Sequence, residues 1–140
     1  MSRRECLIVD SRLDNLFAVQ NWFKDFYNSV EPDLKWVQQE RDRLNIAVAE
    51  GFTNVVRHAH ALLPPETPIT IEVHLEGDRI HINIWDHGAP FDPNQLTEPK
   101  PGSLLVDGGY GWFLLRRVTH QVDYLRKNGK NCLAIIHNRP

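Results

Sequence analysis

The sequence predicts an α+β fold: a two-layer sandwich whose mixed, mostly antiparallel sheet is covered on one face by about three helices. Three observations predict it. Helical patterns follow one short strand at residues 6–10, an alternating hairpin occupies residues 69–84, and a second hairpin closes the chain at residues 122–137. All 140 residues are expected to form one domain, because most domains contain about 100–200 residues.

Helices are expected between the first strand and the first hairpin. Apolar residues recur every three or four positions from Leu16 to Val30, and the spacing of Ser11 and Asp14 predicts a capping box at the start of this helix. A second helical region is predicted from about Leu34 to His60. Apolar residues are missing near residues 39–42, so the second region is expected to break there.

The clearest pattern is the first hairpin, in which apolar and polar residues alternate on both arms around a Gly-Asp turn. A two-residue turn places Val73 opposite Ile82. Asp86 continues the apolar series of the second arm, so its carboxylate is predicted to lie on the helix-covered face. An acid is costly there unless it is hydrogen-bonded.

Residues 88–108 show no periodicity and contain four prolines. An irregular stretch of this length is unusual in a small domain and predicts a functional lid. A third helix is predicted from Gly109 to about His120, and Asn128-Gly129 predicts a type I′ turn in the last hairpin.

Composition excludes several classes of function. Sixteen basic and eighteen acidic residues give a net charge of −2, so direct binding to nucleic acid is not expected. The longest early apolar run is Leu7–Val9, so neither a signal peptide nor a membrane span is expected. Two cysteines without CxxC spacing favour a reduced, cytoplasmic protein.

Three polar segments break the local pattern. Glu50 and Asn54 are four residues apart, so they share one face of an otherwise apolar helix. Asp86 ends a core strand, and Gly88 after it allows a close backbone approach. Gly109-Tyr110-Gly111 opens a helix, whose N-terminus suits a phosphate. Taken alone, each segment also fits ordinary structure, either a solvated helix edge or a turn.

In this order the segments resemble the N, G1 and G2 boxes of the GHKL ATPase superfamily, which has the Bergerat nucleotide-binding fold. The short length and the run Glu50-x-x-x-Asn54-x-x-x-His58-Ala59 are similar to the anti-sigma factor serine/threonine kinases of bacterial partner-switching systems. The resemblance covers residues 7–136, nearly the whole chain.

The resemblance implies ATP and Mg²⁺ as ligands. Glu50 would be the catalytic base, and Asn54 would offer its amide oxygen to Mg²⁺. Asp86 would accept a hydrogen bond from the adenine amino group. The implied nucleotide site comprises Asn54, His58, Asp86, Gly88, Phe91, Gly109, Tyr110 and Gly111.

The resemblance also implies partners: a small anti-sigma-antagonist (STAS) protein phosphorylated on serine, a sigma factor or other regulatory target that the chain sequesters, and a second copy in a homodimer. Two alternatives stay open. A non-catalytic nucleotide-binding adaptor is favoured by the lack of any arginine between His87 and Tyr110. The other is a stand-alone ATPase domain of the histidine-kinase type.

Overall fold

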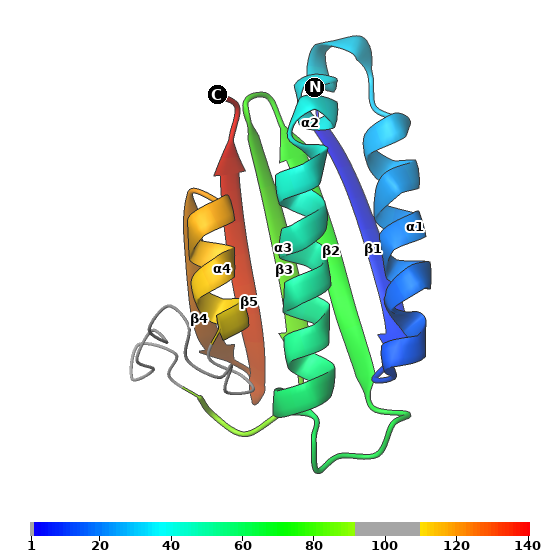
Figure 1. Ribbon diagram of the computed structural model, residues 1–140, viewed down its shortest axis with the longest axis vertical. Helices are drawn as coiled ribbons and strands as arrows, with labels where there is room; N and C mark the ends of the chain where they lie inside the picture. Colours follow the sequence, from blue (N-terminus) through cyan, green and yellow to red (C-terminus); the bar gives the residue numbers. More distant parts are fainter. Residues whose placement is uncertain (1, 92–109) are drawn as a thin grey trace.

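A computed structural model describes residues 2–91 and 110–140, except for the side chain of Tyr110. Figure 1 shows one twisted sheet with helices lying side by side against one of its faces. The chain therefore has the predicted α+β arrangement of one helical layer on one sheet.

The sheet has five strands in the order β1-β2-β3-β5-β4, and its four pairings are all antiparallel. The strands are β1 (Ser2–Asp10), β2 (Pro68–Glu76), β3 (Arg79–Asp86), β4 (Gln121–Lys127) and β5 (Lys130–Asn138). Val73 lies opposite Ile82, as predicted. Asn128 and Gly129 have φ angles of 54° and 75°, and two consecutive positive φ values are what a type I′ turn requires.

The helical layer contains α1 (Leu16–Asn28), the short α2 (Trp36–Gln39), α3 (Arg41–Asn54) and α4 (Tyr110–Val118). The predicted break near residues 39–42 is confirmed, since α2 ends at Gln39 and α3 begins at Arg41. In Figure 1, α3 lies between α1 and α4, in front of the middle of the sheet.

Two predictions about the N-terminal segment are wrong. The first strand begins at Ser2 because it pairs with β2 along its whole length. There is no capping box at Ser11, because this residue is buried and its backbone N–H donates to Thr67 O at 3.1 Å. A 3₁₀ turn at Leu13–Asn15 precedes α1 instead.

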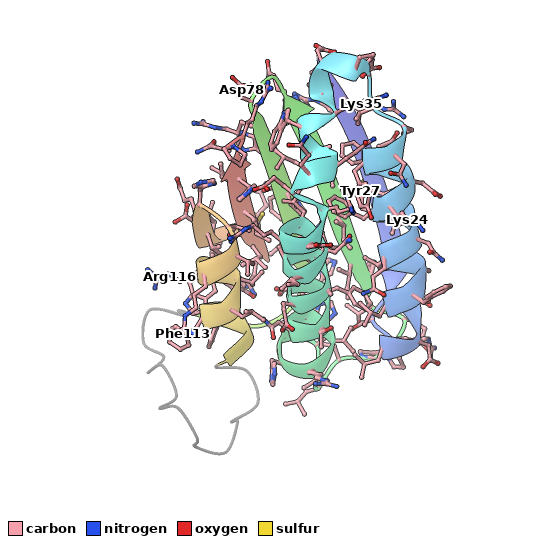
Figure 2. All side chains as sticks on the ribbon, turned by 45° about the horizontal axis from the view of Figure 1, so that its top comes forward. Lys24, Tyr27, Lys35, Asp78, Phe113 and Arg116 are labelled. Atoms are coloured by element: carbon pink, nitrogen blue, oxygen red, sulfur yellow. The ribbon has the colours of Figure 1, made fainter. Side chains whose placement is uncertain are left out.

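Close packing fixes α3 on the sheet. A Cβ added to Gly51 would overlap the Ile84 side chain and lie 3.1 Å from Leu133 Cδ2, so a larger residue here would have to displace these side chains or the helix. On the other side of α3, Asn45 Nδ2 donates to Tyr27 Oη of α1 at 3.4 Å. Figure 2 shows Tyr27 between the two helices.

Among the described residues, no helix combines the length and the apolar character that crossing a bilayer would need.

Candidate functional site

The three polar segments meet at one end of the helical layer. A Cβ added to Gly111 of α4 would lie 2.9 Å from both Asn54 Oδ1 and Glu50 Oε2 of α3. A Cβ added to Gly88, after β3, would lie 2.6 Å from the backbone oxygen of Ala59. Residues far apart in the sequence therefore contact one another around the C-terminal end of α3.

A π-helical turn at Val55–Ala59 follows α3, within the helical region that the sequence predicted up to about His60. The His60 N–H donates to Val55 O at 2.8 Å, which is a bond between residues five apart. Such turns are rare and occur often at functional sites. This turn follows Asn54 directly and carries His58 and Ala59, both of which line the cavity described next.

A cavity of about 350 Å³ opens beside this turn, within the size range of small-molecule sites. Most of its wall is apolar, and Asn54, His58 and Tyr124 add polar groups. Its lining residues in the described part of the chain are Gly51, Asn54, Val55, His58, Ala59, Ala89, Pro90, Phe91, Trp112, Tyr124 and Leu133. The cavity therefore joins Asn54, and residues that directly follow the other two predicted segments, with residues of β4 and β5.

Asp86 lies beside this cavity but is completely buried, and it is not part of the cavity wall. Its Oδ1 accepts hydrogen bonds from Gly88 N at 2.8 Å and from Asn131 Nδ2 at 2.9 Å. Its Oδ2 accepts one from the Tyr124 hydroxyl at 2.6 Å. The predicted acid on the helix-covered face is confirmed, and these three donors offset its loss of hydration.

Sequence reasoning missed the contribution of the last hairpin. Asn131 also donates to Ala89 O at 2.9 Å, and Arg126 donates to Gly88 O at 2.9 Å and to Asn131 Oδ1 at 3.1 Å. These bonds hold the backbone that follows Asp86. The strand register places Asn131 opposite Asp86, so the pairing of β3 with β5 is the signal that identifies Asn131 as a partner of Asp86.

Burial changes the titration of groups around Asp86. Burial, followed by the hydrogen bond to Asp86 and its charge, raises the pKa of Tyr124 well above its usual value. Burial, followed by the charges of Glu72 and Asp86, raises the pKa of Cys132 to about 12. Burial lowers the pKa of His60, although the nearby Asp86 opposes this shift. Tyr124 therefore keeps its proton at neutral pH and acts as a donor to Asp86.

The predicted site residue Phe91 lines the cavity, and so does Trp112, which the sequence analysis did not name as a site residue. Phe91 is half exposed, and its ring makes an edge contact with the Tyr124 ring, with 5.8 Å between the centroids. Trp112 of α4 is 6% exposed, and its buried Nε1 has no hydrogen-bond partner among the described residues. Gly109, the side chain of Tyr110 and residues 92–108 of the expected lid lie outside the described residues.

The sheet, its single helical layer and the cavity at the end of α3 define a protein of the GHKL ATPase class, which the sequence motifs indicated. Residues 9–137 match the family model described as the histidine kinase-like ATPase domain. The chain therefore belongs to this family of ATP-binding domains.

The chain is also similar in sequence to proteins named as protein kinases. The chain is 32% identical over 112 residues to the serine/threonine-protein kinase BtrW of Bordetella bronchiseptica, an alignment that covers 76% of this chain and 77% of BtrW. It is 31% identical over 103 residues to the serine-protein kinase RsbW of Halalkalibacterium halodurans, covering 69% of this chain and 62% of that protein. These similarities relate the chain to a family of protein kinases.

A solved structure has the same fold. The crystal structure of the RsbU and RsbW domains of Rv1364c from Mycobacterium tuberculosis matches with a TM-score of 0.68 at 14% identity. The match covers 99% of this chain and 33% of that one.

Proposed function

We propose that the chain is a serine/threonine protein kinase that binds Mg-ATP in the cavity at the end of α3. It phosphorylates a serine of a small anti-sigma-antagonist (STAS-type) protein and sequesters a sigma factor or another regulatory target in the cytoplasm. The observation that carries this proposal is the contact of Gly111 with both Glu50 and Asn54. This contact sets the N-terminus of α4 beside an amide oxygen and a carboxylate.

The residues present fit a nucleotide with its metal. The first N–H groups of a helix have no intrahelical partner and carry partial positive charge, so the start of α4 suits the phosphates. Asn54 would ligate Mg²⁺ through Oδ1, because this hard cation prefers oxygen ligands. When bound, Mg²⁺ would neutralise phosphate charge.

The cavity also fits the base and sugar. Its apolar wall suits a purine ring, and His58 and Phe91 lie along it. The close approach of Gly88 to Ala59 leaves no room for a side chain at this point of the wall. Asp86 provides the negative charge that selects the adenine amino group.

In the proposed transfer, the serine oxygen of the antagonist forms a bond to the γ-phosphorus while the bond to the β-phosphate oxygen breaks. The serine proton passes to Glu50, and ADP leaves. The unphosphorylated antagonist captures the kinase and releases the sequestered target, and phosphorylation ends that capture. The N-terminus of α4, Asn54 and Glu50 supply positioning and charge, which are the main requirements of phosphoryl transfer.

The test is transfer of label from radiolabelled ATP to a candidate STAS protein, with mass spectrometry to locate the phosphoserine. We expect acid-stable label with the native protein. Glu50→Gln should bind ATP with native affinity and transfer about 10²–10⁴-fold more slowly, because only the base is lost.

Other outcomes identify the two alternative functions. ATP binding without any transferred label would indicate a non-catalytic adaptor, which the absence of arginine between His87 and Tyr110 favours. Acid-labile label would indicate a histidine kinase domain, since phosphohistidine is unstable in acid. Capture from lysate with and without ATP identifies candidate partners for the same assay.

A further inference from the structure

We infer that the chain has a second ligand site, which binds inorganic phosphate, at the end of the helical layer opposite the nucleotide cavity. Two arginines and two histidines form this site: Arg43 of α3, Arg117 of α4, His120 and His137. The inference goes beyond the proposed function and does not depend on it, because the two sites share none of the described residues that line them.

The site is a hollow of about 360 Å³ between the start of α3 and the end of α4. Arg43 lies in the first turn of α3, and Arg117 lies in the last turn of α4. Because α3 has 14 residues, its two ends are about 20 Å apart. The nucleotide cavity lies at its other end, beside Asn54. Figure 1 shows α3 and α4 side by side along this length.

The hollow carries a net positive charge. A guanidinium group stays charged at physiological pH, and its planar fork of N–H groups suits the oxygens of a phosphate. Among the described residues that line the hollow, Glu40 alone has an acidic side chain. Its Oε1 lies 2.7 Å from His137 Nε2, so this carboxylate already has a donor. Two arginines against one paired carboxylate favour an anion.

His120 adds a neutral donor. Its Nδ1 accepts a hydrogen bond from Asn138 N at 3.0 Å, so the neutral ring carries its hydrogen on Nε2. Because His120 is exposed and lines the hollow, this N–H can donate to an oxygen bound there. The donors thus come from two helices and from the segment after α4, an arrangement that suits a tetrahedral group of oxygens better than a flat carboxylate.

His137 supplies the opposite kind of group, an acceptor. A carboxylate can only accept, so the hydrogen shared with Glu40 is on Nε2, and Nδ1 of the neutral ring has a lone pair. The side chain is 4% exposed, and its buried Nδ1 has no hydrogen-bond partner in the described part of the chain. An unpaired buried polar atom is costly, so a ligand that donates to Nδ1 is favoured.

The ring of His120 controls access to this acceptor. It packs on the His137 ring with 4.5 Å between the centroids, and it belongs to an exposed residue. A small shift of the His120 ring therefore opens His137 Nδ1 to a ligand in the hollow.

Three donor groups and one acceptor select among oxyanions. Hydrogen phosphate accepts through its unprotonated oxygens and donates through its P–OH group, so it matches both kinds of group. Sulfate and carboxylates carry no hydrogen at neutral pH, and phosphate monoesters lose theirs with a pKa of about 6. Inorganic phosphate is therefore the ligand that the hollow fits.

The test is calorimetry on the full chain with inorganic phosphate, sulfate and O-phosphoserine at about pH 7.5, where the monoester is ionised. The ionic strength is held constant, because salt screens exposed charges. We expect phosphate to bind about tenfold more tightly than either other anion, the effect of one hydrogen bond to a buried acceptor. This comparison needs no variant.

Variants locate the bound phosphate. Arg43→Gln and Arg117→Gln should each weaken phosphate binding about tenfold, because each loses a charged donor. Both residues are exposed, so neither change disturbs the core. Arg41→Gln is the matched control: it removes the same charge from the same turn of α3, where Arg41 donates to Gln38 O at 2.7 Å and does not line the hollow. It should keep the native affinity.

Three results would overturn the inference. Sulfate that binds as tightly as phosphate would mean that the hollow recognises charge alone. An equal loss of affinity in Arg41→Gln would mean that phosphate is held by no defined site on α3. The third result is a native protein that does not bind phosphate at millimolar concentrations.

A repeat with Mg²⁺ and a non-hydrolysable ATP analogue separates this inference from the proposed function. The analogue should leave phosphate binding unchanged, because its own site is at the other end of α3. If the analogue displaces phosphate, the phosphate lies in the nucleotide cavity, so the inference is wrong and the proposed function stands. If the analogue does not bind, while phosphate binding still requires Arg43 and Arg117, the proposed function alone is wrong.

Discussion

Gly111 of α4 lies directly against the side chain of Asn54 in α3, with no space between them for a methyl group. A Cβ at position 111 would be 2.9 Å from Asn54 Oδ1 and 3.0 Å from Asn54 Nδ2. The proposed phosphate-binding helix and the proposed metal ligand are thus positioned by one backbone contact. Any side chain at this position must displace the ligand or the helix.

Gly111→Ala should therefore impair ligand binding much more than folding. Alanine favours the helix by up to about 1 kcal/mol, which offsets the cost of shifting the ends of Asn54 and Glu50. We expect a free energy of unfolding within about 1 kcal/mol of native and an affinity for Mg-ATP about 10–100-fold lower, as for displaced metal-ligand geometry. Calorimetry and urea unfolding measure the two quantities, and native affinity in the variant would contradict the role given to this contact.

Asn54→Ala should weaken ATP binding only when Mg²⁺ is present. The variant loses the amide oxygen that would ligate the cation, so we expect the gain in affinity on adding Mg²⁺ to shrink about 10–100-fold. Asn45→Ala is the matched control, since Asn45 lies in the same helix and contacts Tyr27 rather than the cavity. A loss of affinity that is equal with and without Mg²⁺ would assign Asn54 another role.

Gly51→Ala should have the opposite profile to Gly111→Ala. Its Cβ would overlap the Ile84 side chain in the core, and overpacking costs about 1–3 kcal/mol, which exceeds the helix-propensity gain of alanine. We expect a melting temperature about 2–5 °C lower and a smaller loss of Mg-ATP affinity than in Gly111→Ala, because the added methyl group meets Ile84 of the core rather than Asn54 and Glu50. An unchanged melting temperature would show that α3 can move away from the sheet without cost.

Local patterns in the sequence predict the helices and strands well, but they predict the contacts between these elements less well. The alternation that placed Val73 opposite Ile82 also put Asp86 on the buried face, because side-chain direction in a strand repeats every two residues. The capping signal at Ser11 predicts a helix start there, but the Ser11 N–H donates to Thr67 O, an acceptor distant in the sequence, and α1 begins only at Leu16. A capping signal cannot reveal such a competing partner.

In the candidate site too, local patterns in the sequence reveal single residues but not the contacts between distant ones. Glu50 and Asn54 were found because polar residues interrupt an apolar helix, which is a local signal. Tyr124 contacts Asp86 across 38 positions of sequence, and its own strand reads as an ordinary edge strand. Nor does any residue type predict the π-helical turn after Asn54, which became visible only in the bond from His60 to Val55. Long-range pairing decides the contact between Tyr124 and Asp86.

His60 should make the stability of the fold depend on pH. It is 3% exposed, its Nε2 accepts a hydrogen bond from His87 N at 2.8 Å, and burial lowers its pKa below 6.5. In the unfolded chain the ring has its ordinary pKa near 6.5, so below this pH the unfolded state binds a proton that the folded state does not. Stability should therefore fall as the pH drops below about 6.5, by at most about 1.4 kcal/mol per pH unit, until the folded ring is protonated too.

The variant that isolates this effect is His60→Gln, which removes the titrating group and keeps an acceptor for His87 N. Urea unfolding at several values between about pH 7.5 and pH 5 should show a steeper loss of stability in the native protein than in the variant. His81, whose pKa is also lowered by burial, is present in both proteins, so the difference between the two slopes reports His60 alone. If the free energy of unfolding falls equally with pH in both proteins, the folded protein binds the His60 proton as readily as the unfolded chain does. Asp86 is the nearby carboxylate that would stabilise the charged ring.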